Sequence, residues 1–132
     1  EFYEGGLRIP FMVRWPGVIK PGRVSDHLGY FPDIMPTLAE LAGVDVPEQS
    51  DGISIVSSLL GRRQKKHEYL YWEYYGNRAV RMGKWKAVGQ PTGNRLQLFD
   101  LSTDLGETNN VADDQPQVAE QIRRIMTEAH DQ

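Results

Sequence analysis

The 132-residue sequence contains no cysteine, which excludes disulfides, catalytic thiols and cysteine-ligated metal sites. It also lacks an apolar run long enough to span a bilayer. Residues 1–6 have neither the charged start nor the apolar core of a signal peptide, and methionine does not come first. We therefore expect the first residues to be the middle of a longer polypeptide.

The sequence has no excess of positive charge, since 15 lysines and arginines face 18 acidic residues and the net charge is -3. The basic cluster within residues 62–66 is short, and we interpret it as a solvated loop, so the charge footprint of a nucleic-acid binder is missing. The three histidines, His27, His67 and His130, lie far apart without helical i, i+4 spacing. This distribution predicts ordinary surface or packing residues rather than metal ligands or bases.

Aromatic residues are concentrated between residues 69 and 100, which hold two of the three tryptophans and four of the six tyrosines. Each apolar run in this stretch is bounded by glycine, asparagine or proline, and a polar loop precedes the last run, which begins at Leu96. Such runs predict a meander of four antiparallel strands joined by turns. Because aromatic side chains bury large apolar areas, we expect the core of this half of the chain here.

Two segments show helical periodicity. Apolar residues spaced i, i+4, i+7 and i+8 predict a helix over residues 30–42, with Asp33 as its N-cap and Gly43 as its stop. Residues 53–60 predict one further helical turn. A C-terminal helix begins near Pro116 and should pack across the sheet. Its apolar face comprises Val118, Ile122, Ile125, Met126 and Ala129.

Residues 7–15 are apolar at most positions and end at a Pro-Gly pair. Near-continuous apolar runs are typical of strands buried on both faces, so we expect a strand of a parallel or mixed sheet. Pro10 cannot donate to a ladder, so either regular pairing begins at Phe11 or this is an edge strand. If its edges are unpaired in the isolated chain, we expect self-association or a loosely held first half.

Short motifs follow one another in the order and spacing of the later part of type I sulfatases. They include Tyr3-Glu4-Gly5-Gly6, Arg14-Trp15-Pro16-Gly17, Asp51-Gly52-Ile53-Ser54, Lys84-Trp85-Lys86 and the group Asp104, Glu107 and Asn110. The chain thus resembles the C-terminal portion of an arylsulfatase or N-sulfoglucosamine sulfohydrolase-like enzyme. Leu105 departs from the family pattern, which usually has proline there, and this costs a rigid turn but nothing chemical.

The order of elements predicts an α+β fold, in which a four-stranded antiparallel sheet with a C-terminal helix packed on it occupies residues 62–132. The resemblance implies that residues 1–61 are the strand, loop and helix that end an alkaline-phosphatase-like α/β domain. This strand-helix remnant would precede the sheet subdomain.

The resemblance also implies hydrolysis of sulfate esters, or of sulfamates in some members, on carbohydrates or aryl compounds. Such enzymes use a formylglycine made from Cys or Ser in a Cys/Ser-x-Pro/Ala-x-Arg motif, and a calcium ion held by Asp and Asn. This chain contains no such motif. In the family, the metal ligands and a sulfate-contacting lysine precede the Glu-Gly-Gly motif, so we expect no catalytic residue, metal ligand or cofactor in this chain.

The implied partners are the N-terminal catalytic domain of the parent chain and a sulfated carbohydrate or aryl sulfate substrate. The family implies a periplasmic or secreted location, or a lysosomal one in a eukaryote. Two alternatives remain open at this stage. One is a stand-alone carbohydrate-binding or interaction module with the aromatic strands as its platform, and the other is a phosphatase or phosphonate hydrolase of the same superfamily.

Glu73 is the carboxylate that most needs an explanation, because a buried carboxylate among aromatic side chains must meet a cation, water or a polar ligand. Strand alternation places it on the face of Tyr69, Tyr71 and Tyr75, opposite Leu70, Trp72 and Tyr74. One interpretation is a cross-strand pair with Arg78 or Arg81. In the other, Glu73, Trp72 and Tyr75 border the substrate pocket of the intact enzyme.

Arg8 is a further candidate for substrate binding, because the guanidinium fork matches sulfate oxygens in pairs. An arginine near a turn more often pairs locally or satisfies carbonyl groups, and we retain both interpretations.

Overall fold

The computed structural model describes residues 2–90 and 95–130. It divides into two compact units. The sheet unit comprises residues 1–10 and 68–132, and the helical unit comprises residues 11–67. The first ten residues thus belong to the same unit as residues 68–132, more than fifty residues later in the chain. The prediction instead divided the chain once, between residues 61 and 62.

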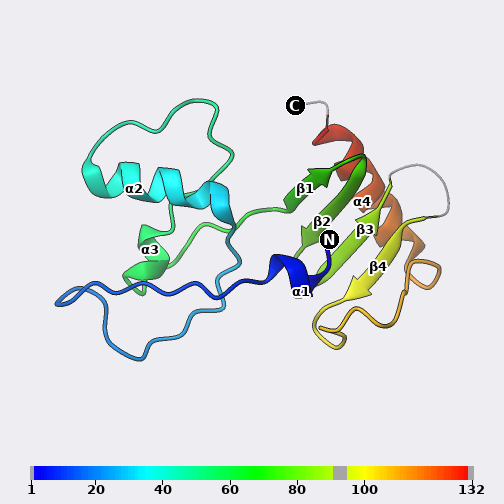
Figure 1. Cartoon of the computed structure of the whole chain (residues 1–132), viewed down its shortest axis with the longest axis horizontal. Helices are drawn as coiled ribbons and strands as arrows, with labels where there is room; N and C mark the ends of the chain where they lie inside the picture. The colour runs from blue at the N-terminus through cyan, green and yellow to red at the C-terminus, as the bar shows by residue number, and fades with distance from the viewer. Residues whose placement is uncertain (1, 91–94, 131–132) are drawn as a thin grey trace. The chain divides into compact units, whose positions relative to one another are not determined.

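The sheet unit contains the predicted four-stranded antiparallel meander, with strands adjacent in sequence order (Figure 1). The strands are β1 (Leu70–Tyr74), β2 (Asn77–Met82), β3 (Trp85–Gly89) and β4 (Gln97–Asp100). Part of the polar loop expected before β4, residues 91–94, lies outside the described residues.

The turn between β1 and β2 begins at Tyr75, a residue that the predicted alternation places on the strand. Tyr74 pairs with Asn77, so the turn residues are Tyr75 and Gly76, with φ of 48° and 74°. Positive φ at both positions is the signature of a type I′ hairpin turn, whose twist matches that of the strands. The predicted alternation therefore ends at Tyr74, and the Tyr75 side chain, 86% exposed, belongs to the turn.

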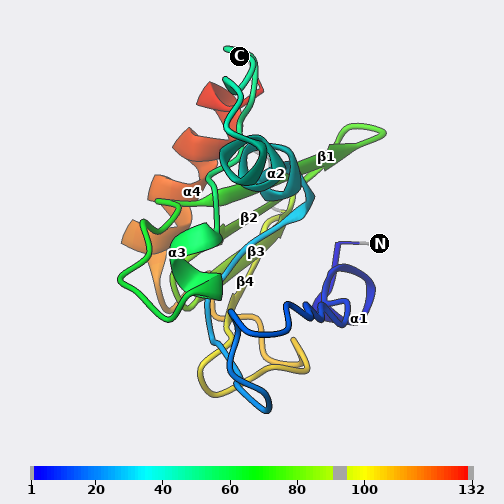
Figure 2. The same cartoon turned by 90° about the vertical axis from the view of Figure 1, so that its left-hand side faces the viewer.

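The core of the sheet unit lies between one face of the sheet and α4 (Pro116–Glu128), as predicted. Of the predicted helical face, Ile122 and Met126 are fully buried, and Val118 and Ile125 pack at the margin. Figure 2 shows α4 on one face of the sheet and α1 (Glu4–Leu7) on the other. The buried core cluster consists of Val80, Ala87, Leu96, Leu98, Ala119, Ile122 and Met126.

The strand predicted over residues 7–15 is wrong. Leu7 ends α1, and residues 8–15 have no regular secondary structure. Pro10 cannot donate to a ladder, and no strand in the described ranges pairs with this segment. Its apolar side chains are exposed instead, including Met12 at 90%. Any self-association of this segment would therefore rest on exposed apolar side chains rather than on open strand edges.

The helical unit contains the predicted helix, which starts as a 3-10 turn (Phe31–Asp33) and continues as α2 (Ile34–Ala42). Gly43 ends it with φ of 68°, and the Val44 N–H donates to the Ala39 carbonyl at 3.0 Å, as in a Schellman motif. α3 (Val56–Leu59) is the short turn expected within residues 53–60.

Candidate functional site

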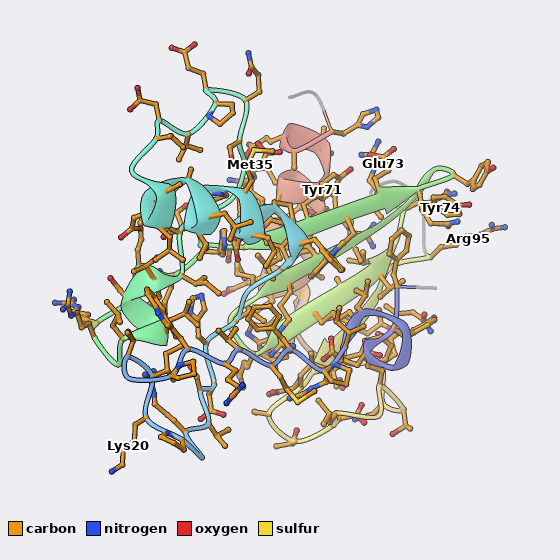
Figure 3. The ribbon with its side chains drawn as sticks, turned by 60° about the vertical axis from the view of Figure 1, so that its left-hand side comes forward. Lys20, Met35, Tyr71, Glu73, Tyr74 and Arg95 are labelled. Carbon is orange, nitrogen blue, oxygen red and sulfur yellow. The ribbon has the colours of Figure 1, made fainter. Side chains whose placement is uncertain are left out.

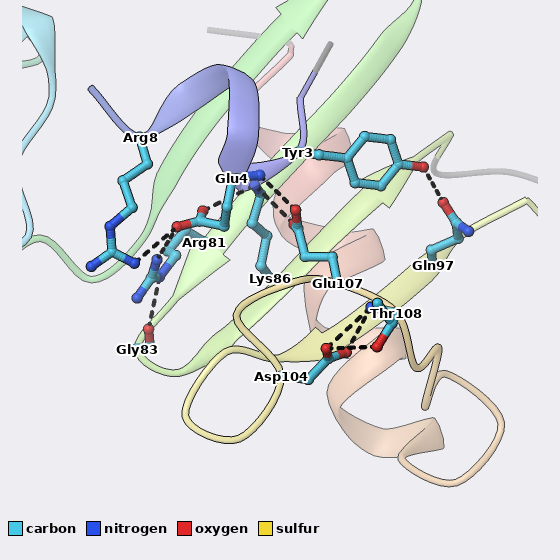
Figure 4. Close-up of polar contacts among 10 residues, drawn as sticks. All are labelled: Tyr3, Glu4, Arg8, Arg81, Gly83, Lys86, Gln97, Asp104, Glu107 and Thr108. Atoms are coloured by element: carbon cyan, nitrogen blue, oxygen red, sulfur yellow. Dashed lines mark hydrogen bonds and ion pairs between the residues drawn. The ribbon is translucent and has the colours of Figure 1, made fainter. Parts of the chain in front are cut away.

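The face of the sheet opposite α4 holds a buried lysine. Lys86 lies on β3, where Arg81 and Phe99 are its cross-strand neighbours, and its side chain is fully buried. Its Nζ lies 3.0 Å from Glu4 Oε1 and 3.0 Å from Glu107 Oε1 (Figure 4). A buried ammonium is tolerated only when it is paired and hydrogen-bonded, and here two carboxylates supply the pairing.

Glu107 contacts both the lysine and the N-terminal helix. Its side chain is almost fully buried, and Oε2 accepts a hydrogen bond from the Glu4 backbone N–H at 2.5 Å. The backbone of Glu107 has φ of 54°, a left-handed conformation that is uncommon for a residue other than glycine. Such backbone persists where the surroundings fix it, and it is enriched at functional positions.

Two arginines complete the cluster around Glu4. Arg81 Nη1 lies 3.3 Å from Glu4 Oε2, and Arg8 Nη1 lies 3.8 Å from the same atom, one helical turn along the chain. The local pairing considered for Arg8 is therefore present, although most of its side chain stays exposed. Three cations thus face two carboxylates, and we call Glu4, Lys86 and Glu107 the buried charge cluster.

Glu73 lies at the β1 edge of the sheet, where Figure 3 labels it beside Tyr71, and it has two side-chain hydrogen-bond partners. The Tyr71 hydroxyl donates to Oε2, His130 Nδ1 lies 2.8 Å from the same oxygen, and Arg78 Nε lies at 3.6 Å. Glu73 and Arg78 are directly opposite in the register, so the predicted cross-strand pair is present. The hydrogen bonds from Tyr71 and His130 lower the pKa of Glu73. Burial and the bond to Glu73 raise the pKa of Tyr71 to about 12.

The four predicted substrate contacts are not gathered into one pocket of the sheet unit. Trp72 lies on the face opposite Glu73, as alternation requires, and Tyr75 lies in the hairpin turn. Tyr75 stacks edge-on against Tyr74, with ring centroids 4.4 Å apart, and both rings are exposed. Arg8 follows α1 and pairs with Glu4. Contact of these residues with a substrate stays a prediction.

In the helical unit, the buried Asp33 carboxylate organises the loop that carries the Asp51-Gly52-Ile53-Ser54 motif. Oδ1 accepts from the Ile53 N–H at 2.8 Å and lies 2.8 Å from His67 Nε2, and Oδ2 accepts from the Tyr30 N–H at 3.0 Å. Asp33 occupies the N-cap position of α2, but its side chain does not cap that helix. His67 is a buried partner of Asp33, and burial lowers the pKa of His27 nearby.

The groups that sulfatase chemistry requires do not fit the residues present. Within residues 2–90 and 95–130, no set of three or more His, Asp or Glu side chains could hold a metal ion. The sequence provides neither a cysteine nor the serine motif from which formylglycine forms. We therefore derive no step through formylglycine or a metal ion from these residues. None of the described helices is long and apolar enough to cross a membrane.

The meander with its terminal helix also occurs in solved sulfatases, which have an alkaline-phosphatase-like fold. One such structure, from work on glycosaminoglycan metabolism in Bacteroides thetaiotaomicron, has a TM-score of 0.78 at 29% identity, covering 98% of this chain and 30% of that one. The chain belongs to the family described as N-sulphoglucosamine sulphohydrolase, C-terminal, whose model matches residues 1–132.

Two curated relatives show the same relationship. A Δ4,5-hexuronate-2-O-sulfatase of Bacteroides thetaiotaomicron is 36% identical over 125 residues, which cover 86% of this chain and 26% of the relative. Bovine (Bos taurus) arylsulfatase A is 36% identical over 145 residues, covering 89% of this chain and 28% of the relative. The chain thus spans about a quarter of the length of these relatives.

Proposed function

We propose that this chain is the C-terminal portion of a sulfatase that hydrolyses sulfate esters of a sulfated carbohydrate. The observation that carries the proposal is the match to the sulfatase family over the whole chain. A relative named for a 2-O-sulfated hexuronate supports a sugar substrate. The parent would supply formylglycine and calcium from its preceding part, and a periplasmic or secreted location, or a lysosomal one in a eukaryote, follows from the same resemblance.

Within that enzyme, this chain would provide scaffold and pocket walls. Aromatic faces suit sugar rings, and the exposed rings at the end of β1 are available for such contacts. Hydrogen bonds from Tyr71 and His130 lower the pKa of Glu73. In the intact enzyme its carboxylate would also accept hydrogen bonds from sugar hydroxyls. Glu73, Trp72 and Tyr75, with Arg8 as a sulfate contact, remain the proposed wall residues.

The test compares the 132-residue chain with its full-length parent on a panel of sulfated sugars and an aryl sulfate. We expect turnover by the parent and none by the isolated chain, because the sequence has no Cys/Ser-x-Pro/Ala-x-Arg motif and the described residues hold no metal site. The control is the parent with its upstream Cys or Ser replaced by Ala. Turnover by the purified chain alone would contradict its inactivity, and a parent that cleaves only phosphate or phosphonate esters would refute the sulfatase assignment.

We also propose that the preceding catalytic part of the parent covers the apolar face of α2. Met35 and Leu38 on this helix are 56% and 60% exposed, and they line a groove of about 610 Å³ (Met35 is labelled in Figure 3). The buried apolar residues of the helical unit, in the part that the structure describes, are Pro36, Ala39, Ile55 and Val56. So small a core is marginal by itself, and contiguous apolar surface usually marks an interface.

Replacing Leu38 with lysine should therefore have a favourable effect in the isolated chain and an unfavourable one in the full-length parent. In the isolated chain we expect less self-association, measured by light scattering over a concentration series. In the parent we expect the free energy of unfolding to fall by about 2–3 kcal/mol, because a buried leucine contact is lost. Gln49→Lys, at an exposed position, is the charge-matched control. A parent that tolerates both variants equally would argue against the covered face.

A further inference from the structure

We propose that Lys86 and Glu107 are positioning residues, which fix the Tyr3–Glu4 turn, and the polypeptide that enters it, against the open face of the sheet. The link to activity rests on the proposed function, in which the reacting groups lie in the part of the parent that precedes this turn. Neither residue touches the reacting atoms in this proposal. Both act through the orientation of α1 (Figure 4).

The geometry restrains α1 through both its backbone and its side chain. Glu107 uses one oxygen for Lys86 and the other for the Glu4 N–H. The Glu4 carboxylate in turn contacts Lys86 through Oε1 and Arg81 through Oε2. A rotation or a slide of α1 along the sheet would break contacts at both oxygens of each carboxylate, so the cluster permits one placement of the helix.

α1 cannot hold this placement by its own stability. It has four residues, far fewer than an isolated helix needs in water. Tyr3 adds a second point of attachment on the same face. Its hydroxyl donates to Gln97 Oε1 at 2.5 Å, and its ring packs edge-on against Phe99 with the ring centroids 6.2 Å apart. The segment is thus attached to β3, β4 and the Glu107 loop at once, through contacts 82 to 103 residues apart in the sequence.

Stability alone gives a poor account of this arrangement. Replacing a buried ion set with apolar side chains of similar volume is often neutral or stabilising, so a sheet selected for stability alone does not need a lysine here. Glu107 also adopts a left-handed backbone that a non-glycine residue adopts at an energetic cost. What these features provide is a defined orientation, and small errors in the placement of reacting groups cost large factors in rate.

The first test measures hydrogen exchange in the 132-residue chain carrying Glu107→Gln or Lys86→Met. The N–H groups of Gly6, Leu7 and Arg8 report on α1, because they donate to the carbonyls of Tyr3 and Glu4. In Glu107→Gln we expect these amides to exchange about tenfold faster or more, while the β2–β3 ladder keeps its protection. In Lys86→Met, which destabilises the whole sheet unit, we expect faster exchange in both α1 and the ladder. Lys84→Met, which removes an exposed lysine paired with Asp100, is the matched control. Unchanged protection of α1 in Glu107→Gln would overturn the proposal.

The second test uses the full-length parent. We expect Glu107→Gln to lower kcat about ten- to hundredfold with KM within about twofold, because the reacting groups are displaced while substrate contacts remain. The matched Lys84→Met variant should keep both constants. Faster exchange in α1 with an unchanged kcat would overturn the positioning role. A parent without sulfatase activity would refute the proposed function instead. The exchange measurement would still decide whether Lys86 and Glu107 fix α1 on the sheet.

Discussion

Replacing Gly52 with alanine is expected to disrupt the helical unit. A Cβ at this position would lie 2.0 Å from the Pro32 carbonyl oxygen, 2.4 Å from its carbon and 2.9 Å from the Asp33 nitrogen. All three are backbone atoms, so no side-chain rotation can relieve the overlap. The loop would have to move away from the 3-10 turn, which explains why glycine occupies this place in the Asp-Gly-x-Ser motif.

The displacement would also break polar contacts on which the unit depends. The Ile53 N–H, one residue later, donates to the buried Asp33 carboxylate, and a buried carboxylate that loses partners is costly. We expect Gly52→Ala to lower the stability of the helical unit by about 3 kcal/mol or more. Hydrogen exchange of α2 and of Ile55 measures this directly, because the Ile55 N–H donates to Thr37 Oγ1.

The control for Gly52 is Gly106, whose added Cβ would meet Thr108 Cγ2 at 3.6 Å, an ordinary van der Waals distance. Gly106→Ala should leave the exchange pattern nearly unchanged. If the two alanine variants behaved alike, the close approach at Gly52 would not constrain the fold as the geometry requires.

The elements predicted correctly are those whose signal is local. The four strands follow from aromatic and β-branched runs bounded by turn residues, and α4 follows from apolar residues at helical spacing. The pair of Glu73 and Arg78 was one of two pairs that the sequence left open, and the turn at Tyr75 and Gly76 sets the register that selects it. The strand prediction for residues 7–15 failed because an apolar run indicates that a segment favours contact with other groups, but not whether a sheet provides that contact.

The polar clusters could not be derived from the sequence, because their members are distant along the chain. Asp33 and His67 are 34 residues apart, and Glu4 and Lys86 are 82 apart. No local pattern pairs such residues, and a lone histidine or lysine has several ordinary explanations. One feature of the sequence could have indicated that Lys86 is buried. It lies between Trp85 and Ala87 in a short apolar strand, and if that strand is central, the face on which the lysine lies is covered.

Replacing Lys86 with methionine is expected to destabilise the sheet unit strongly. Methionine matches the length of the lysine stem, so packing is largely kept, but Glu4 and Glu107 lose the ammonium that both contact at 3.0 Å. Removing one partner from a buried ion set typically costs about 3–5 kcal/mol, and urea denaturation of the chain measures that loss. Lys84→Met should change stability little, because its ion pair with Asp100 is exposed and screened.

Neutralising the whole cluster separates the two roles that charge can have here. The triple variant Lys86→Met, Glu4→Gln, Glu107→Gln removes all three charges of the buried charge cluster. Arg81 loses its pairing with Glu4, but its side chain is 20% exposed and still donates to the Gly83 carbonyl. We therefore expect the triple variant to recover most of the stability lost in the single variant. A triple variant less stable than Lys86→Met would contradict this account of the cluster. The informative outcome is a triple variant that regains stability while its α1 amides still exchange rapidly. The charges would then specify where α1 lies rather than whether the sheet unit folds. Neutral groups can fill the same volume, but they do not define one orientation of the helix.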